Sequence, residues 1–289
     1  MIRHMFLAAA VAMFGLADAV DAQDRSTVMV GDLTVSYGDT GTGTPIVLVH
    51  GGGLTSRMWG GFVEAAAPTH RLLTPDTRNH GGTDNPSGTF TYDLAAEDLA
   101  GFIAALGLEQ PVVMGYSDGG IIVQKFLIAH PGVASAAVIG GATNRVAADD
   151  HYMAGMRTFY GYDQRGDLPD EVLDALEVNA PDFAGRLKAL HGGDAAPDRW
   201  RDLHQLAWPV WTTEMVIPDE QLATIDLPVL VILGQNDDFF RSEDALALAE
   251  ALPKGEIALI PGASHSAFRE RPEIFAALVL DFLTRSTAQ

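Results

Sequence analysis

A serine flanked by glycines is the feature of this sequence with the clearest chemical meaning. The segment Gly115-Tyr116-Ser117-Asp118-Gly119 has the pattern G-x-S-x-G, with an apolar run before it at 111–114 and a helical pattern beginning near Gly120. A serine on such a strand-to-helix turn is exposed as a nucleophile, and the free N–H groups of the following helix favour negative charge beside it. This placement predicts that Ser117 is a nucleophile rather than an incidental turn residue.

A nucleophilic serine needs a general base, and the base needs an acid that orients it. Of the nine histidines, only His265 lies beyond the last apolar run, and two neighbouring carboxylates, Asp237 and Asp238, follow the apolar run at 229–233. The order serine, acid, histidine is typical of a nucleophile on this kind of turn. We therefore predict a catalytic triad of Ser117, His265 and one of the two aspartates.

A row of glycines offers a place for the negative charge that develops on a substrate. His50-Gly51-Gly52-Gly53 ends the apolar run at 45–50, and glycines allow the backbone to approach a ligand closely. Alone, such a segment would be an ordinary turn. Together with a nucleophilic serine it predicts an oxyanion hole made by the backbone N–H groups of Gly52 and Asp118, with Gly53 as the second choice for the first donor.

Alternating apolar runs and helical patterns must position these residues. A loose hairpin pattern at 28–37 opens the regular part of the chain. Continuous apolar runs, typical of strands buried on both faces, alternate with segments of helical spacing. We expect an α/β fold with a mostly parallel sheet flanked by helices on both faces. The predicted strands are 45–50, 72–75, 111–114, 136–139, 229–233 and 257–260, and the predicted helices are 94–106, 121–128, 244–252 and 274–283.

The pattern breaks between 143 and 227, where strong strand runs are missing and Trp, Tyr and Met side chains are frequent. We predict a helical cap insertion over the sheet edge, which divides the core domain into 23–142 and 228–289. Apolar residues at helical spacing usually pack in a core, but a lid over a substrate pocket needs them as well. Both interpretations stay open, and Trp208 and Trp211 are the candidate substrate-binding residues.

The N-terminus has the character of a targeting segment. Arg3 and His4 precede an almost wholly apolar run at 5–16, and small residues follow it. This arrangement predicts a signal peptide at 1–22, cleaved after Ala22 with Ala19 as the alternative, and hence a secreted or periplasmic protein. The run is too short to span a bilayer comfortably, so we expect no stable membrane insertion after cleavage.

Charge and composition narrow the range of partners. The chain of 289 residues carries a formal net charge of -20, which gives it no basic surface for nucleic acid. With no cysteines it has no disulfide, no thiol nucleophile and no thiolate metal site. We expect a small-molecule substrate and neither a metal nor an organic cofactor. The oligomeric state is left open.

The sequence resembles the α/β-hydrolase superfamily, in the branch of small serine esterases, lactonases and non-haem haloperoxidase-like proteins. The resemblance covers the chain from the hairpin to the last helix. In the family the acid lies three residues after the glycine that corresponds to Gly234, so the resemblance implies Asp237 rather than Asp238. Asp118 stands where relatives often have Met or Gln, and Asn79 stands where glycine is more usual. The motifs that carry the resemblance are His50-Gly51-Gly52, 76–83, 115–120, 234–237 and 262–265.

The resemblance and the triad together predict hydrolysis of a carboxylic ester or lactone through an acyl-enzyme. The serine argues against relatives that use an aspartate nucleophile. Amide or aminoacyl hydrolysis, carbon–carbon bond hydrolysis and cofactor-free perhydrolysis use the same triad and remain alternatives. A ligand-binding sensor on a hydrolase scaffold is the alternative from another class, although a pure binder does not need a complete triad.

Overall fold

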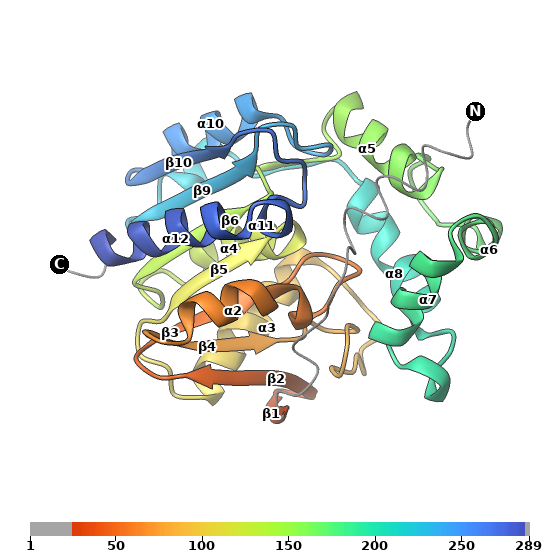
Figure 1. Ribbon diagram of the computed structural model, residues 1–289, viewed down its shortest axis with the longest axis horizontal. Coiled ribbons are helices and arrows are strands. Elements are labelled where there is room, and N and C mark those ends of the chain that lie inside the picture. The colour runs from red at the N-terminus through yellow and green to blue at the C-terminus, as the bar shows by residue number, and fades with distance from the viewer. Residues whose placement is uncertain (1–24, 287–289) are drawn as a thin grey trace.

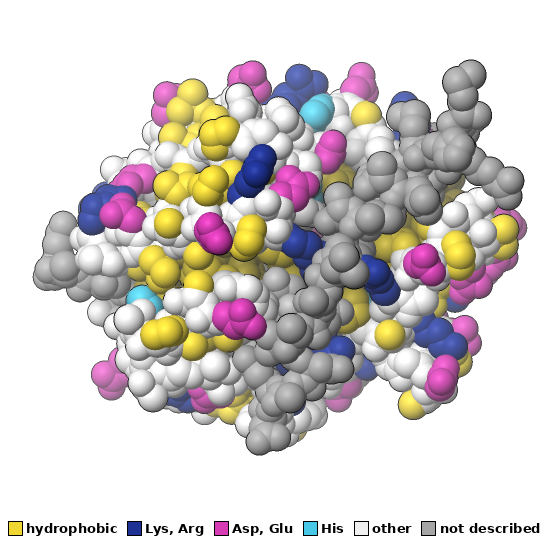
Figure 2. All heavy atoms as spheres, in the orientation of Figure 1, with side chains coloured by type: hydrophobic (Ala, Val, Ile, Leu, Met, Phe, Trp, Pro, Cys, Tyr) yellow, Lys and Arg dark blue, Asp and Glu magenta, His cyan; other side chains and the backbone are white. Residues whose placement is uncertain are grey.

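The computed structural model describes residues 25–286. The predicted signal peptide at 1–22 and its cleavage site lie outside the described residues, so export stays a prediction. Within the described range, no helix is long and apolar enough to cross a membrane. Asp and Glu side chains are spread across the face shown in Figure 2, in keeping with the acidic composition.

A twisted sheet of eight strands forms the centre of the molecule (Figure 1), in the order β1-β2-β4-β3-β5-β6-β9-β10. The first hairpin and its contact with β4 are antiparallel, and every other pairing is parallel. This confirms the expected α/β fold. The strands are β1 (Ser26–Val30), β2 (Leu33–Gly41), β3 (Thr44–Val49), β4 (His70–Pro75), β5 (Val112–Tyr116), β6 (Ala136–Gly140), β9 (Val229–Gly234) and β10 (Gly255–Ile260).

Helices cover both faces of this sheet because its inner strands are apolar on both sides. In β9, Val229, Val231 and Leu233 pack in one buried cluster, and Leu230 and Ile232 pack in the other. The first cluster includes α3 (Tyr92–Ala105), α4 (Asp118–Ala129) and α10 (Ser242–Ala251), and the second includes α2 (Gly60–Ala66) and α12 (Pro272–Ser286). The described residues also contain two short helices, α9 (Asp219–Leu222) and α11 (Ala267–Glu270), and the 3-10 turns Ser56–Trp59 and Gly193–Ala195.

The helices of the predicted insertion gather at one end of the sheet (Figure 1). They are α5 (Asp150–Tyr160), α6 (Asp170–Asn179), α7 (Pro181–Leu190) and α8 (Arg199–Thr212). Two short antiparallel strands, β7 (Arg145–Val146) and β8 (Met215–Val216), join the two ends of the insertion, and sequence patterns did not predict them. Asn144 and Ile217 extend this junction, since each carbonyl oxygen accepts a hydrogen bond from the other residue, at 2.9 and 3.0 Å.

The turn between β5 and α4 is held by close backbone packing. Ser117 has φ 56° and ψ -121°, a conformation that side chains rarely adopt. A Cβ on Gly115 would lie 2.0 Å from the carbonyl oxygen of Gly119, and a Cβ on Gly119 would lie 2.1 Å from that of Val49. The two glycines of the motif are therefore required because there is no space for a side chain at either position.

Gly119→Ala should destabilise the protein by about 1–3 kcal/mol or more, since the added methyl group collides with the backbone of β3. The matched control is Gly61→Ala, also at the second position of a helix, where a Cβ meets no atom within 4 Å. Alanine is the better helix former, so this control should leave stability unchanged or slightly higher. Urea unfolding of both variants measures the effect. An equal loss in the two would contradict the packing argument.

Candidate active site

Three loops at the carboxyl ends of strands bring Ser117, His265 and Asp237 into one hydrogen-bonded line. Ser117 follows β5, Asp237 follows β9 and His265 follows β10. His265 Nε2 lies 3.1 Å from Ser117 Oγ, and His265 Nδ1 lies 2.8 Å from Asp237 Oδ2. The hydroxyl of Tyr116 also donates to the carbonyl oxygen of His265 at 2.8 Å, which fixes the backbone of the histidine loop.

The structure distinguishes the two neighbouring aspartates. The second oxygen of Asp237 accepts hydrogen bonds from the N–H groups of Phe239 and Phe240, at 2.9 and 3.0 Å, so its carboxylate has a fixed orientation. Asp238 is an exposed residue, and partial desolvation of its carboxyl group together with the adjacent Asp237 carboxylate raises its pKa. Asp237, the residue implied by the family resemblance, is the aspartate that bonds to His265.

The charge around His265 favours its protonated form. Burial of the ring lowers the pKa of His265, but the nearby carboxylates, Asp237 foremost, more than offset this, and the net pKa lies above the ordinary value. A histidine in this position can accept a proton from Ser117 and hold it next to a fixed carboxylate.

A cavity opens beside Ser117 and His265, and its lining of mainly apolar and aromatic side chains with a few polar groups is typical of small-molecule sites. Trp211 lines it. Trp208 does not: its ring is fully buried and its Nε1 donates to the carbonyl oxygen of Gln164, so we no longer expect it to touch a substrate. None of the described lining residues is Lys or Arg. The lining residues are Gly52, Gly53, Leu54, Ser117, Asp118, Tyr152, Met156, Phe159, Tyr160, Phe183, Leu187, His204, Trp211, Phe239, Phe240 and His265.

Comparison with known proteins agrees with the observed fold. The model of the alpha/beta hydrolase family matches residues 46–278 of the chain. The chain belongs to this family.

Several relatives of this alpha/beta hydrolase share nearly its full length. The solved esterase RhEst1 from Rhodococcus sp. ECU1013 is 29% identical with a TM-score of 0.71, over 90% of this chain and 98% of that one. BpoC of Mycobacterium tuberculosis, which bears a provisional name as a non-heme bromoperoxidase, is 28% identical over 86% of this chain and 97% of its own. A 2-hydroxy-6-oxo-2,4-heptadienoate hydrolase of Pseudomonas putida is 24% identical over 91% and 98%.

The glycine turn of this hydrolase meets the cavity at Gly52. Within the described residues, the backbone N–H groups of Gly52 and Asp118 donate no hydrogen bond, and both residues line the cavity. The N–H of Gly53, the second choice from the sequence, already donates to Nε2 of His80 at 3.2 Å. Of Gly52 and Gly53, Gly52 is therefore the residue whose backbone N–H is free to bind an oxyanion.

Buried histidines hold this turn in place. His191, which follows α7, accepts a hydrogen bond from the N–H of Gly81 at 3.1 Å, and its Nε2 lies 3.0 Å from the carbonyl oxygen of Gly53. Burial lowers the pKa of His191 to about 3, and it also lowers the pKa of His80 and of His50. These rings are neutral near pH 7. His191 links the insertion to the turn, and His80 bonds to the turn from the core.

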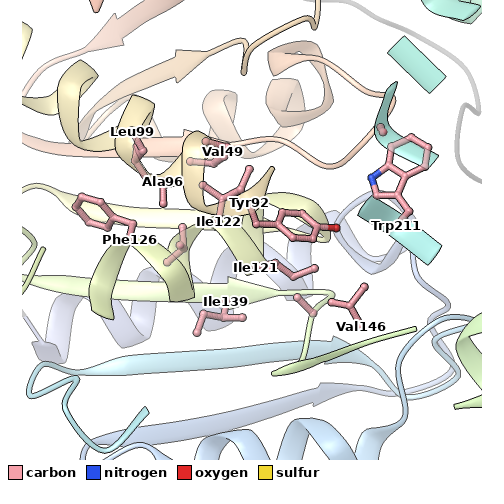
Figure 3. Packing of buried hydrophobic residues seen from close by; sticks show 14 of the residues in the cluster. Val49, Tyr92, Ala96, Leu99, Ile121, Ile122, Phe126, Ile139, Val146 and Trp211 are labelled. Atoms are coloured by element: carbon pink, nitrogen blue, oxygen red, sulfur yellow. The ribbon is translucent and has the colours of Figure 1, made fainter. Parts of the chain in front are cut away.

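Asp118 carries a buried carboxyl group next to Ser117. Tyr92, from α3, donates to one oxygen at 2.9 Å, and Trp211, from α8, donates to the other at 2.6 Å. In Figure 3 the hydroxyl of Tyr92 and the indole nitrogen of Trp211 point toward the same space from two sides. Burial raises the pKa of Asp118 to about 6, although both donors oppose the rise. Sequence patterns did not indicate where the Asp118 side chain points and did not single out Tyr92.

Trp211→Phe tests the bond between α8 and the Ser117 turn. The indole N–H stabilises the charged carboxylate of Asp118 more than the neutral acid, so its loss raises the pKa of Asp118 further. The substitution should therefore cost about 2 kcal/mol of unfolding free energy at pH 8, where Asp118 is ionised, and less at pH 5, where it is protonated. Urea unfolding at the two pH values measures the difference.

Trp208→Phe is the matched control for this experiment. Trp208 lies on the same helix as Trp211, but its indole N–H donates to a neutral acceptor, the carbonyl oxygen of Gln164. Its cost should be about 1 kcal/mol at both pH values. If Trp211→Phe shows no pH dependence, the indole does not stabilise a charged Asp118.

Proposed function

We propose that this protein is a serine hydrolase that cleaves a neutral carboxylic ester or lactone. The observation that carries the proposal is the continuous line from Asp237 through His265 to Ser117 at the wall of a largely apolar cavity. A complete triad of this geometry has a use in acyl transfer and none in simple ligand binding.

Each residue of the line has a defined part in the proposed reaction. His265 Nε2 takes the proton of Ser117 as Oγ attacks the substrate carbonyl carbon, and Asp237 stabilises the imidazolium that forms. The N–H groups of Gly52 and Asp118 hold the oxyanion. When the tetrahedral intermediate collapses, His265 returns the proton to the leaving alkoxide. Water then attacks the acyl-enzyme by the same steps, releasing the acid and restoring Ser117.

The charge of the cavity favours a neutral substrate. One relative is named as a 2-hydroxy-6-oxo-2,4-heptadienoate hydrolase, and this name marks its substrate as a carboxylate. A carboxylate in the present cavity would lie among apolar side chains with the acidic Asp118 and with no Lys or Arg in the described lining. Carbon–carbon bond hydrolysis on the same triad is therefore the second candidate. Ester or lactone cleavage is the first, in line with the similarity to the esterase RhEst1.

We also propose that the insertion at 143–227 acts as a cap that shapes the acyl pocket. Several apolar lining residues belong to it, among them Met156 and Phe159 from α5 and Phe183 from α7. Burial of an apolar chain against them would contribute about 25 cal/mol for each Å² removed from water.

Ser117→Ala tests the proposed nucleophile. The variant should lose covalent labelling by an organophosphonate and lose turnover by a factor on the order of 10⁶, because no other group can form the acyl-enzyme. The assay compares the parent and the variant on a panel of p-nitrophenyl esters, lactones and aminoacyl amides. A parent protein that binds the phosphonate without covalent attachment and turns over none of the panel would indicate a binding protein instead.

The two aspartates give a matched pair of variants. Asp237→Asn should lower kcat by a factor on the order of 10⁴, because the amide cannot stabilise the imidazolium and favours the wrong tautomer of His265. Asp238→Asn should keep a kcat close to that of the parent, since this side chain does not bond to His265. Circular dichroism checks that both variants are folded. A larger loss of kcat in Asp238→Asn would identify Asp238 as the acid. An unchanged kcat in both variants would contradict the triad.

A further inference from the structure

His204 is a buried histidine of the cavity wall that the proposed reaction does not use. It lies on α8, it is fully buried, and it lines the cavity together with Ser117. Its Nδ1 lies 2.6 Å from the carbonyl oxygen of Trp200, one helical turn earlier. A carbonyl oxygen only accepts hydrogen bonds, so Nδ1 carries the proton. In the neutral ring Nε2 is then a hydrogen-bond acceptor.

The acceptor of His204 has no partner among the described residues. The ring cannot turn freely to find one, because the rings of Tyr160, Trp200 and Trp211 pack around it at centroid distances of 5.7–5.8 Å. A buried polar atom without a hydrogen bond is costly, and native structures contain only a few of them. The packing of α8 therefore holds an unsatisfied acceptor at a fixed place in the cavity wall.

The acceptor faces the same turn that would hold the substrate carbonyl. A Cβ built on Gly53 would lie 3.2 Å from Nε2 of His204, and the neighbouring residue Gly52 supplies the proposed oxyanion donor. Nε2 therefore lies beside the turn that carries the proposed oxyanion donor.

The ring accepts hydrogen bonds across the ordinary pH range. Burial lowers the pKa of His204 to about 4, so it carries no charge near pH 7. Asp118, another polar side chain beside this turn, also accepts hydrogen bonds. Two acceptors without a neighbouring cation disfavour a ligand carboxylate and suit a group that donates, such as a hydroxyl.

We propose that His204 determines substrate specificity by accepting a hydrogen bond from a hydroxyl on C2 or C3 of the acyl chain, so that the substrates are hydroxyacyl esters or the corresponding lactones. This inference rests on the proposed ester hydrolysis. The inference adds to that proposal the chemical class of the acyl group. The hydroxyl supplies the missing donor, and an acyl chain without it leaves Nε2 buried and unpaired.

Matched substrate pairs test the inference on the parent protein. The pairs are the p-nitrophenyl esters of 3-hydroxybutyrate and 3-methylbutyrate, and of 2-hydroxybutyrate and 2-methylbutyrate, in which a methyl group replaces the hydroxyl at similar volume. After correction for spontaneous hydrolysis, kcat/KM should favour the hydroxyl member of at least one pair by about tenfold or more. Equal values within both pairs would overturn the inference and leave ester hydrolysis intact.

Variants of His204 assign the preference to its Nε2. His204→Asn keeps a donor near the Nδ1 position for the Trp200 carbonyl oxygen and removes the acceptor. The ratio of kcat/KM between the hydroxyl and methyl members of a pair should therefore fall to near one. His204→Gln places an amide oxygen near the Nε2 position and should keep part of the preference. Trp208→Phe, in the same helix but outside the cavity lining, should leave it unchanged.

Labelling of Ser117 by a phosphonate shows that each variant keeps a folded active site. A preference that persists undiminished in His204→Asn would overturn the role of Nε2, and if that variant does not fold, His204→Phe provides the same comparison. Absence of both labelling and ester turnover in the parent protein would overturn the proposed function, and this inference with it.

Discussion

The whole site depends on the sharp turn at Ser117, where the backbone is held in a conformation that is unfavourable for a serine. Such a conformation costs on the order of 1–3 kcal/mol and persists only where the surroundings enforce it. Here the N–H of Ser117 donates to the carbonyl oxygen of Gly140, and the N–H of Gly120 donates to that of Ser117, both at 2.8 Å. Because β5 is fully buried between β3 and β6, the strand cannot shift to relieve the turn.

Burial sets the charges that this turn presents to a ligand. The same desolvation keeps His191 and His204 neutral and raises the pKa of Asp118 to about 6, while the carboxylate of Asp237 keeps the pKa of His265 high. Burial and a carboxylate partner therefore act in opposite directions on the buried histidines. His191 and His204, which bond to no carboxylate, serve as neutral hydrogen-bonding groups, and His265, which bonds to Asp237, can take up a proton.

Sequence reasoning succeeded where a requirement is local and failed where it depends on contacts between distant segments. The strand–serine–helix pattern and the apolar runs predicted the sheet and the position of Ser117, because glycine spacing and hydrophobic periodicity are properties of short segments. The short pair β7–β8 has only two residues in each strand and no periodicity to detect.

Trp208 and Trp211 show the same limit at the level of side chains. Three residues apart on one helix, they were equal candidates from the sequence, yet only Trp211 reaches the cavity. The partners Tyr92 and Trp211 lie 26 and 93 residues from Asp118, so no local pattern could join them to it. The choice of Asp237 over Asp238 came from the spacing seen in the family. Local composition could not separate the two aspartates, because they are adjacent in the same loop.

The insertion is joined to the core by hydrogen bonds beside the nucleophile and beside the proposed oxyanion donor. Trp211 bonds to Asp118 beside the nucleophile, and His191 bonds to Gly53 beside the proposed oxyanion donor. Apolar contacts alone would allow the helices of the insertion to slide, since they have little directional preference. Hydrogen bonds fix distance and angle. Because both elements of the proposed oxyanion hole are anchored to the insertion, a movement of α8 or of the end of α7 changes the pocket and the reacting geometry together.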